Sequence, residues 1–294
     1  GGKFDKSFNE LAFRTAERVK NELGWDMIEF EAANNTQIEQ GMRKVADRGA
    51  NLVIAMGFAQ ADAVAAVAPQ YPDVNFVAVD VCWVDDPAGN IYQACYKEHE
   101  GSFLVGMIAA MASKSGKIGF VGGMDIPLIR KFQGGYEQGA LYVNPNIEIH
   151  ANMTGTTPEA WNNPTKGAEL TKAQIDKGAD VVYQAAGGTG IGVLQAAADA
   201  GIMGIGVDTN QNYMHPGNML TSMLKRLDLT IFEQAEKTAA GTFEPGIHIL
   251  GLAEGAVGYA TEDGMVTDEM AAAVEAAAAE IVSGAMSVAD WSQE

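Results

Sequence analysis

Short apolar runs alternate with longer helical patterns along almost the whole chain, and this alternation limits the possible fold more than any other feature. The apolar runs, such as residues 52–55, are continuous rather than alternating with polar residues. Continuous runs are typical of strands that are buried on both faces of a sheet. Alternation of strands and helices predicts parallel sheets with helical crossovers, so we expect an α/β fold.

The predicted strands cover residues 27–33, 51–57, 75–80, 90–96, 117–122, 147–153, 180–185, 202–207, 219–223, 248–252 and 257–260. The predicted helices cover residues 10–23, 37–48, 60–70, 98–112, 129–143, 158–177, 193–200, 229–240 and 268–282. Because so many strands do not fit comfortably into one sheet of a 294-residue chain, two similar lobes across a cleft are expected. Small polar stretches at 113–117 and 241–246 predict the crossings, which gives lobe 1 residues 1–115 and 247–294 and lobe 2 residues 116–246.

The chain is strongly acidic, with a formal net charge of −19 at pH 7. Contacts with phosphate groups need clustered Lys and Arg side chains, so neither nucleic acid nor an anionic membrane is expected as a partner. No apolar run approaches the roughly 18 residues that a membrane-spanning helix needs, and none is predicted.

Little in the sequence favours catalysis or a metal centre. The four histidines have no H-E-x-x-H spacing and are scattered: His99, His150, His215 and His248. No G-x-S-x-G nucleophile elbow occurs, so we expect no enzymatic activity, no cofactor and no metal. Cys82 and Cys95 flank a hairpin-like segment, and both a disulfide and two buried free thiols are compatible with this spacing.

Loops that follow the predicted strands carry most of the candidate binding residues. Ligands bind at this end of the strands in open α/β sheets. Phe58 fits either a core position or a binding wall, and Asp125 fits either a helix cap or a ligand contact. The turn that contains Gly187 and Gly188 lacks the G-x-G-x-x-G spacing, so it is either a ligand-facing turn or an ordinary tight turn.

Two charged residues end neighbouring apolar runs. Asp208 ends one run and Lys225 ends the next. Together they offer an acceptor and a donor to a ligand, and a purely structural ion pair is the alternative.

The first nine residues combine aromatic and polar side chains where a helical pattern begins. Two phenylalanines, including Phe8, lie among Asp5, Ser7, Asn9 and two lysines. This combination suggests a surface for a flat, polar small molecule. The alternative is an ordinary helix start, with Asp5 or Ser7 as the N-cap and Phe8 in the core.

Six segments of the chain occur in the order that is found in one protein family. They are residues 2–9, 100–103, 122–127 with 132–136, 186–190, 206–208 and 222–225. On these segments the chain resembles the basic membrane protein (BMP, Med/PnrA-like) family of substrate-binding proteins of ABC importers. The resemblance implies the type I periplasmic-binding-protein fold, with two Rossmann-like lobes around a ligand cleft.

The resemblance also implies a ligand and a set of ligand-binding residues. The ligand would be a purine nucleoside (adenosine, guanosine or inosine), delivered to an ABC permease by a monomeric receptor. That receptor would be periplasmic or lipid-anchored to the outer face of the cytoplasmic membrane. The implied roles are stacking on the base by Phe8 beside Asn9, base-edge contact by Asp125, binding of the ribose hydroxyls by Asp208 and Lys225, close backbone approach at Gly187 and Gly188, and a wall contact by Phe58. Asp5 is included in the ligand-binding set without a specific role.

Three alternatives remain beside the nucleoside receptor. The same fold binds sugars and other small polar ligands, it serves in sensors without a transport role, and enzymes of nucleoside metabolism also bind nucleosides. The chain departs from the family pattern in one respect, because no apolar strand ending in Asp precedes the first glycine loop. We therefore expect the natural protein to supply that strand from residues outside this sequence, and the lobe without it to have unpaired strand edges.

Overall fold

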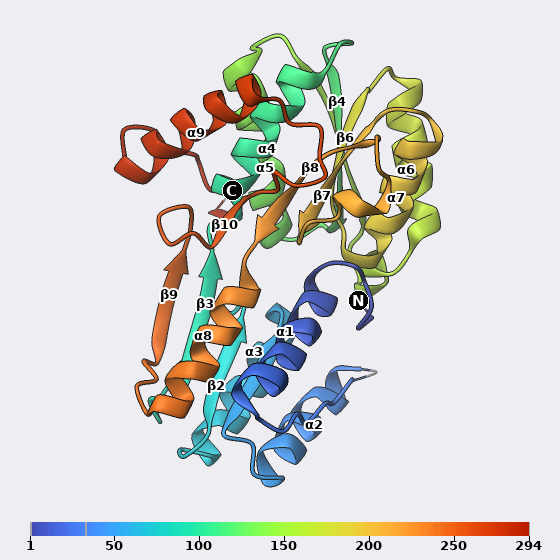
Figure 1. Cartoon of the computed structure of the whole chain (residues 1–294). Helices are drawn as coiled ribbons and strands as arrows, with labels where there is room; N and C mark the ends of the chain where they lie inside the picture. Colours follow the sequence, from blue (N-terminus) through green and yellow to red (C-terminus); the bar gives the residue numbers. More distant parts are fainter. Residues whose placement is uncertain (1, 33, 294) are drawn as a thin grey trace. The chain divides into compact units, whose positions relative to one another are not determined.

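A computed structural model describes residues 2–32 and 34–293, and the chain folds into two compact units. Unit 1 comprises Gly1–Glu10, Lys97–Arg226 and Gly251–Glu294. Unit 2 comprises Leu11–Tyr96 and Leu227–Leu250. Each unit contains its own sheet with helices around it, so the α/β prediction is confirmed (Figure 1).

Unit 1 contains a six-stranded sheet in the order β10-β8-β7-β6-β4-β5. Its strands are Lys117–Met124 (β4), Glu148–Gly155 (β5), Val181–Ala185 (β6), Met203–Asp208 (β7), Met219–Lys225 (β8) and Val257–Tyr259 (β10). All neighbours are parallel except β10, which runs antiparallel to β8. Because parallel strands end at one common edge, the sheet places the last residues of β6, β7 and β8 side by side.

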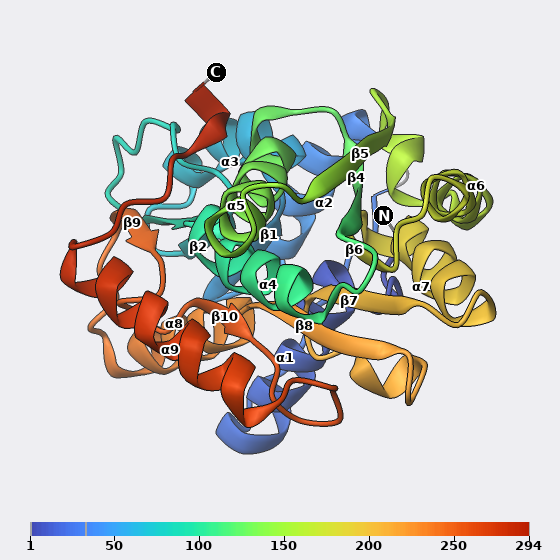
Figure 2. The same cartoon turned by 90° about the horizontal axis from the view of Figure 1, so that it is seen from above.

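Helices cover both faces of the unit 1 sheet, as a parallel sheet requires. Figure 2 shows α4 (Glu98–Ala112) and α5 (Pro127–Val143) on one face and α6 (Pro164–Asp176) and α7 (Gly190–Asp199) on the other. A further helix, α9 (Asp268–Ser283), packs against α4.

Glycines allow α4 and α5 to pack closely. A side chain at Gly106 of α4 would collide with the backbone carbonyl of Tyr136, and one at Gly139 of α5 would collide with that of Phe103. Hydrogen atoms at these positions therefore set the short distance between the two helix backbones.

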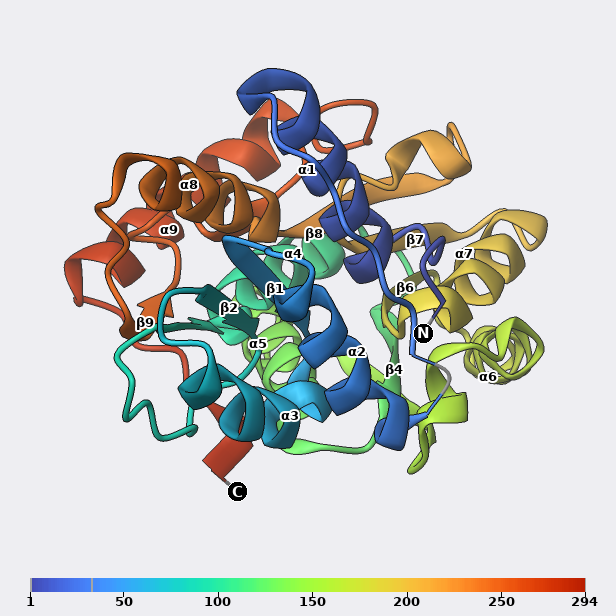
Figure 3. The ribbon, with the colours of Figure 1, turned by 90° about the horizontal axis from the view of Figure 1, so that it is seen from below.

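Unit 2 contains a four-stranded parallel sheet in the order β1-β2-β3-β9. Its strands are Leu52–Met56 (β1), Asn75–Val79 (β2), Ile91–Tyr96 (β3) and Gly246–Leu250 (β9). Its helices are the Leu11–Leu23 part of α1 (Phe8–Leu23), with α2 (Asn35–Asp47), α3 (Ala61–Val67) and α8 (Leu227–Ala240). Figure 3 shows α2 and α3 on one side of β1 and β2, and α8 with α1 on the other.

The predicted strand at 27–33 is wrong for the residues that are described. Residues 27–32 form no strand, and Ala33 lies outside the described residues. A strand needs hydrogen-bonding neighbours, and in the described part of the chain β1 pairs only with β2. Phe30 in this segment is 41% exposed, so the segment also lacks the burial that a parallel strand requires. β1 is an edge strand of the described sheet.

The structure divides the chain at other points than the predicted crossings. The stretch at 113–117 is a tight turn inside unit 1, where the Asp180 carboxylate accepts hydrogen bonds from Ser113 Oγ (2.6 Å) and from the backbone N–H groups of Lys114 and Ser115 (both 2.7 Å). The stretch at 241–246 connects α8 to β9 inside unit 2. The small polar residues of both stretches form turns within a unit. The boundaries between the two units fall after residues 10, 96, 226 and 250.

The two cysteines form a disulfide in unit 2. Cys82 follows β2 and Cys95 lies in β3, and their Cα atoms are 5.7 Å apart. This result decides between the two alternatives that the sequence left open. Among the described residues, no helix is long and apolar enough to span a membrane, and no cluster of side chains has the composition of a metal site.

Candidate functional site

The loop that precedes α1 is held in shape by one buried carboxylate. Asp5, which is 4% exposed, accepts hydrogen bonds from the backbone N–H groups of Ser7 (2.9 Å), Asn9 (3.1 Å) and Glu10 (3.1 Å). It also accepts one from Asn9 Nδ2 at 2.8 Å. Asp5 therefore caps the start of the helix, as the second sequence interpretation expected. Phe8 stays half-buried at the first turn instead of entering the core completely.

Hydrogen bonds attach this loop to the carboxyl ends of the unit 1 strands. Ser7 Oγ donates a hydrogen bond to the carboxylate of Asp208, the last residue of β7. Gln211 Nε2 donates to the carbonyl of Lys6 at 2.8 Å, and Gln211 Oε1 accepts from Gln184 Nε2 at 2.9 Å. The loop and the strand ends thus form one hydrogen-bonded surface.

Asp208 adopts an unusual backbone conformation at this edge. Its φ angle is +65°, in the left-handed region that costs most residues conformational energy. Local backbone strain of this kind is concentrated at functional sites. Asp208 is 7% exposed, so its carboxylate is desolvated as well.

Lys225 ends β8 beside Asp208 and is 1% exposed. Its Nζ lies 2.9 Å from Oε1 of Glu98, which is fully buried at the start of α4. The same Nζ lies 5.4 Å from the ring centroid of Phe8 and 5.8 Å from that of Phe132, within the range of cation–π attraction. The ammonium therefore joins the aromatic start of α1 to the strand ends.

The glycine turn after β6 lies against the same loop. Gly187 and Gly188 form the beginning of a 3-10 turn (Gly187–Thr189), and Gly187 has a φ of +55°. A methyl group at Gly188 would touch the Cβ of Asp5 and the carbonyl of Trp161. Glycine thus permits the backbone to approach the loop and the tryptophan closely.

Trp161 is a further candidate site residue that the sequence did not indicate. It ends a short 3-10 helix (Pro158–Trp161), and its ring packs against Gly123 and lies near Gly187. Thr189 Oγ1 anchors the turn by donating a 2.7 Å hydrogen bond to the carbonyl of Ala160. Its signal in the sequence is an aromatic residue shortly after a predicted strand, but the helix predicted at 158–177 includes this position.

Asp125 and Phe58 have other contacts than the remaining predicted residues. Asp125 receives two 2.9 Å hydrogen bonds from the guanidinium of Arg130. Both residues line a hollow of about 350 Å³ on unit 1. Phe58 begins a 3-10 turn (Phe58–Gln60) in unit 2. The other seven predicted residues gather at the strand ends and loop of unit 1: Asp5, Phe8, Asn9, Gly187, Gly188, Asp208 and Lys225.

This surface combines three kinds of recognition chemistry. Phe8 and Trp161 offer aromatic faces, which bind flat rings. The carboxylate of Asp208 accepts hydrogen bonds from hydroxyl groups, and the ammonium of Lys225 donates them. The site is therefore suited to a neutral molecule with a flat ring and neighbouring hydroxyls.

The buried tyrosines behind the strand ends stay uncharged. Burial raises the pKa values of Tyr136 and Tyr183 well above 10.0. Tyr183 lies in β6 and shares a 3.2 Å hydrogen bond with Ser102 of α4. These two hydroxyl groups therefore add no negative charge to the region at neutral pH.

The fold and the site define a class, that of two-lobed solute-binding proteins of ABC transporters with the type I periplasmic-binding-protein fold. A solute-binding protein from Aeropyrum pernix has a similar structure, with a TM-score of 0.88 and 26% identity, covering 99% of this chain and 91% of that one. At 17% identity and a TM-score of 0.64, a Caulobacter myo-inositol binding protein shares the fold, covering 90% of this chain and 93% of that one.

The chain belongs to the Bmp family, described as "ABC transporter substrate-binding protein PnrA-like", whose pattern matches residues 1–292. It is 33% identical to basic membrane protein A2 of Borrelia garinii over 95% of this chain and 82% of that protein. It is 31% identical to a Lactococcus lactis protein named "ABC transporter nucleoside-binding protein BmpA", over 97% of this chain and 85% of that protein. The chain is therefore a substrate-binding protein and not an enzyme, as the sequence predicted.

Proposed function

We propose that this chain binds a purine nucleoside and delivers it to an ABC permease at the outer face of the cytoplasmic membrane. One observation carries the proposal, namely the half-buried Phe8 ring that lies beside the Lys225 ammonium and is attached through Ser7 to Asp208. An aromatic ring stacks on a purine, and a carboxylate with an ammonium matches the two hydroxyls of a ribose. The name of the Lactococcus lactis relative supports the same ligand class.

Within this proposal each residue of the site has a role. Phe8 and Trp161 contact the faces of the base, and Asn9 beside Phe8 contacts its edge. Asp208 and Lys225 bind the ribose hydroxyls. The turn at Gly187 lets the ligand approach the backbone.

Asp125 and Phe58 are the least well supported of the proposed ligand-binding residues. The carboxylate of Asp125 already binds Arg130 through both oxygens, so a base contact there competes with that ion pair. Phe58 is only half-buried and belongs to unit 2. We propose both as secondary contacts.

The proposal also predicts which related molecules are rejected. Asp208 repels a phosphate placed next to the sugar, and the net charge of −19 adds to that repulsion. Nucleosides are therefore expected to bind more tightly than nucleotides. The disulfide in unit 2 supports a location outside the cytoplasm, because such bonds persist in oxidising compartments.

Mass spectrometry of the small molecule released from denatured, freshly purified protein tests the proposal without choosing a ligand in advance. A purine nucleoside in amounts close to that of the protein is the expected result. A stoichiometric sugar, cyclitol or amino acid in its place would contradict the proposal. Protein that releases nothing is then titrated with nucleosides and with sugars, and binding of sugars alone would contradict it equally.

A further inference from the structure

The buried lysine of the site is held by a carboxylate that the ligand does not need to touch. Glu98 is fully buried, and its Oε1 lies 2.9 Å from Lys225 Nζ. A buried ammonium requires such a partner because an uncompensated buried charge is strongly destabilising. An ammonium also has three N–H donors, so fixing one of them towards Glu98 sets the directions of the other two.

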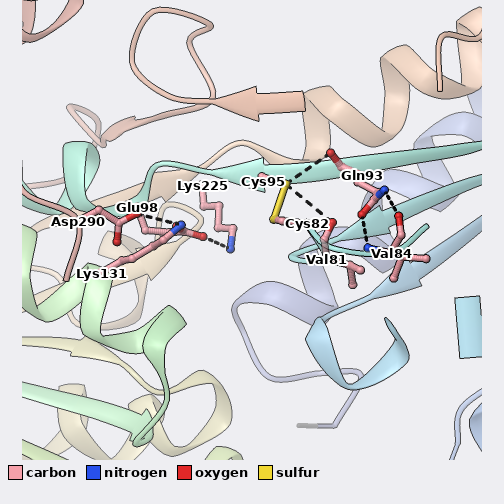
Figure 4. Close-up of a disulfide and its surroundings, with 9 residues drawn as sticks. All are labelled: Val81, Cys82, Val84, Gln93, Cys95, Glu98, Lys131, Lys225 and Asp290. Carbon is pink, nitrogen blue, oxygen red and sulfur yellow. Dashed lines mark hydrogen bonds and ion pairs between the residues drawn. A yellow bond between two sulfur atoms is a disulfide. The ribbon is translucent and has the colours of Figure 1, made fainter. Parts of the chain in front are cut away.

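Glu98 is itself shared between two lysines. Its second carboxylate oxygen, Oε2, lies 3.4 Å from Nζ of Lys131, which is on α5 and 17% exposed. The same Nζ lies 3.8 Å from Oδ2 of Asp290 near the C-terminus. Figure 4 shows these four side chains in a row, from Lys225 through Glu98 and Lys131 to Asp290. Two positive and two negative charges make the row electroneutral.

The outer end of the row belongs to a segment that is bound firmly to α5. We call residues 288–292 the C-terminal strap. Gln138 of α5 donates a 2.9 Å hydrogen bond to the carbonyl of Ala289 and accepts a 2.8 Å bond from its N–H group. The ring of Trp291 packs against Gly134, where any larger residue would collide with it. These contacts fix the position of Asp290 relative to Lys131.

Asp290 stays ionised in this arrangement. Burial alone would raise the pKa of its carboxyl, but hydrogen bonds from Ser292 and the positive charge of Lys131 outweigh burial and lower it below 3.8. The strap therefore presents a permanent negative charge to Lys131 at neutral pH.

We propose that Glu98, Lys131 and Asp290 are positioning residues for Lys225, and that they orient its ammonium towards the hydroxyls of the ligand. The C-terminal strap thereby influences affinity without touching the ligand. Asp290 holds Lys131 beside Oε2 of Glu98, and Oε1 of Glu98 holds the ammonium of Lys225. This inference rests on the proposed function, because it assumes that Lys225 donates to the sugar.

The test compares Glu98→Gln with wild type on two ligands, a purine ribonucleoside and its 2′,3′-dideoxy analogue. The analogue lacks the hydroxyls that Lys225 would bind. Only the affinity for the ribonucleoside should therefore depend on the orientation of the ammonium. Glu98→Gln is expected to weaken ribonucleoside binding at least tenfold and dideoxynucleoside binding less than twofold. In a cycle with Lys225→Met, the two losses for the ribonucleoside are expected to be strongly non-additive.

Glu100→Gln is the matched control, with the same change of charge two residues further along α4. Glu100 accepts a 2.9 Å hydrogen bond from the N–H of Leu252 and pairs with Lys97 at 3.0 Å, away from the row. It is expected to leave the ratio of the two affinities unchanged. Equal losses for both ligands in Glu98→Gln, or no loss, would overturn the proposal.

Asp290→Asn and Lys131→Gln keep the proposal testable if Glu98→Gln does not fold. Each is expected to weaken ribonucleoside binding about threefold and to spare the dideoxynucleoside, while Asp290→Glu restores affinity. If the ratio of ribonucleoside to dideoxynucleoside affinity is unchanged in both variants, these residues do not position Lys225 and the proposal is overturned. Wild type that binds neither ligand would overturn the proposed function and this inference together, whereas wild type that binds both, with equal losses in the variants, overturns this inference alone.

Discussion

At the scale of single residues, the site depends on groups that are buried although they are polar. Asp5, Asp208, Glu98 and Lys225 are each less than 9% exposed. Burial of this kind is costly unless each charge has partners. Asp5 binds the N–H of Ser7, Asp208 binds Ser7 Oγ, and Lys225 pairs with Glu98. Burying these polar groups has an energetic cost, which is consistent with a surface that recognises hydroxyl groups.

Replacing Phe8 with alanine is expected to weaken nucleoside binding by roughly 5- to 150-fold, because base–aromatic stacking contributes about 1–3 kcal/mol. Phe4→Ala is the control, since Phe4 lies in the same loop and is 65% exposed. Isothermal titration of both variants with one nucleoside measures the difference. Equal affinities of Phe8→Ala and Phe4→Ala would show that Phe8 does not stack on the base.

The buried imidazole of His99 is expected to make the free energy of unfolding depend on pH. Burial lowers the pKa of its imidazole below the usual 6.5. The unfolded chain then binds the proton more readily than the folded chain, so the free energy of unfolding falls as pH decreases through 6.5, by at most about 1.4 kcal/mol per pH unit. His99→Gln is expected to reduce this slope in urea unfolding series between pH 7 and 5. An identical slope in the variant would contradict the assignment.

At the scale of elements, the sequence predicted the strands and helices well because their apolar patterns are continuous and long. It failed at 27–33, where the local pattern of a strand is present but a neighbouring strand is not. It also failed for the boundaries of the units, since turn composition reports local geometry and not which contacts cross a boundary. Trp161 was missed for a related reason, because only the fold brings the loop after β5 against the turn after β6.

The close packing of α4 on α5 can be tested with one methyl group. Gly139→Ala is expected to destabilise the protein by about 1–3 kcal/mol, because the Cβ would collide with the backbone carbonyl of Phe103 and force the helices apart. Gly258→Ala in β10 is the control, since no heavy atom lies within 4 Å of the added group. Denaturant unfolding compares the two, and equal stabilities would refute the tight crossing.

The disulfide between Cys82 and Cys95 stabilises unit 2 by shortening a loop in the unfolded chain. The two residues are 13 positions apart. A loop of this length predicts a contribution of about 3 kcal/mol. Thermal unfolding with and without a reductant is expected to show a lower Tm after reduction, while a Cys82→Ala/Cys95→Ala variant no longer responds to the reductant. An unchanged wild-type Tm would contradict the prediction.

At the scale of the whole molecule, membership of the Bmp family establishes a substrate-binding protein of an ABC transporter. The family pattern covers nearly the whole chain, so the sequence could define this class. It could not define the geometry of the site, because residues from 5 to 225 meet only in the folded unit 1. In particular, the pairing of Lys225 with Glu98 joins positions 127 residues apart that no local pattern connects.

The central claim is that this site binds a purine nucleoside, and calorimetric titration of the whole protein tests it most directly. Guanosine, adenosine and inosine are titrated in parallel with ribose, myo-inositol and the matching 5′-monophosphates. At least one nucleoside is expected to bind with one-to-one stoichiometry and to exceed its monophosphate and free ribose in affinity by tenfold or more. Tight binding of ribose or myo-inositol, with no heat from any of the three nucleosides, would contradict the account.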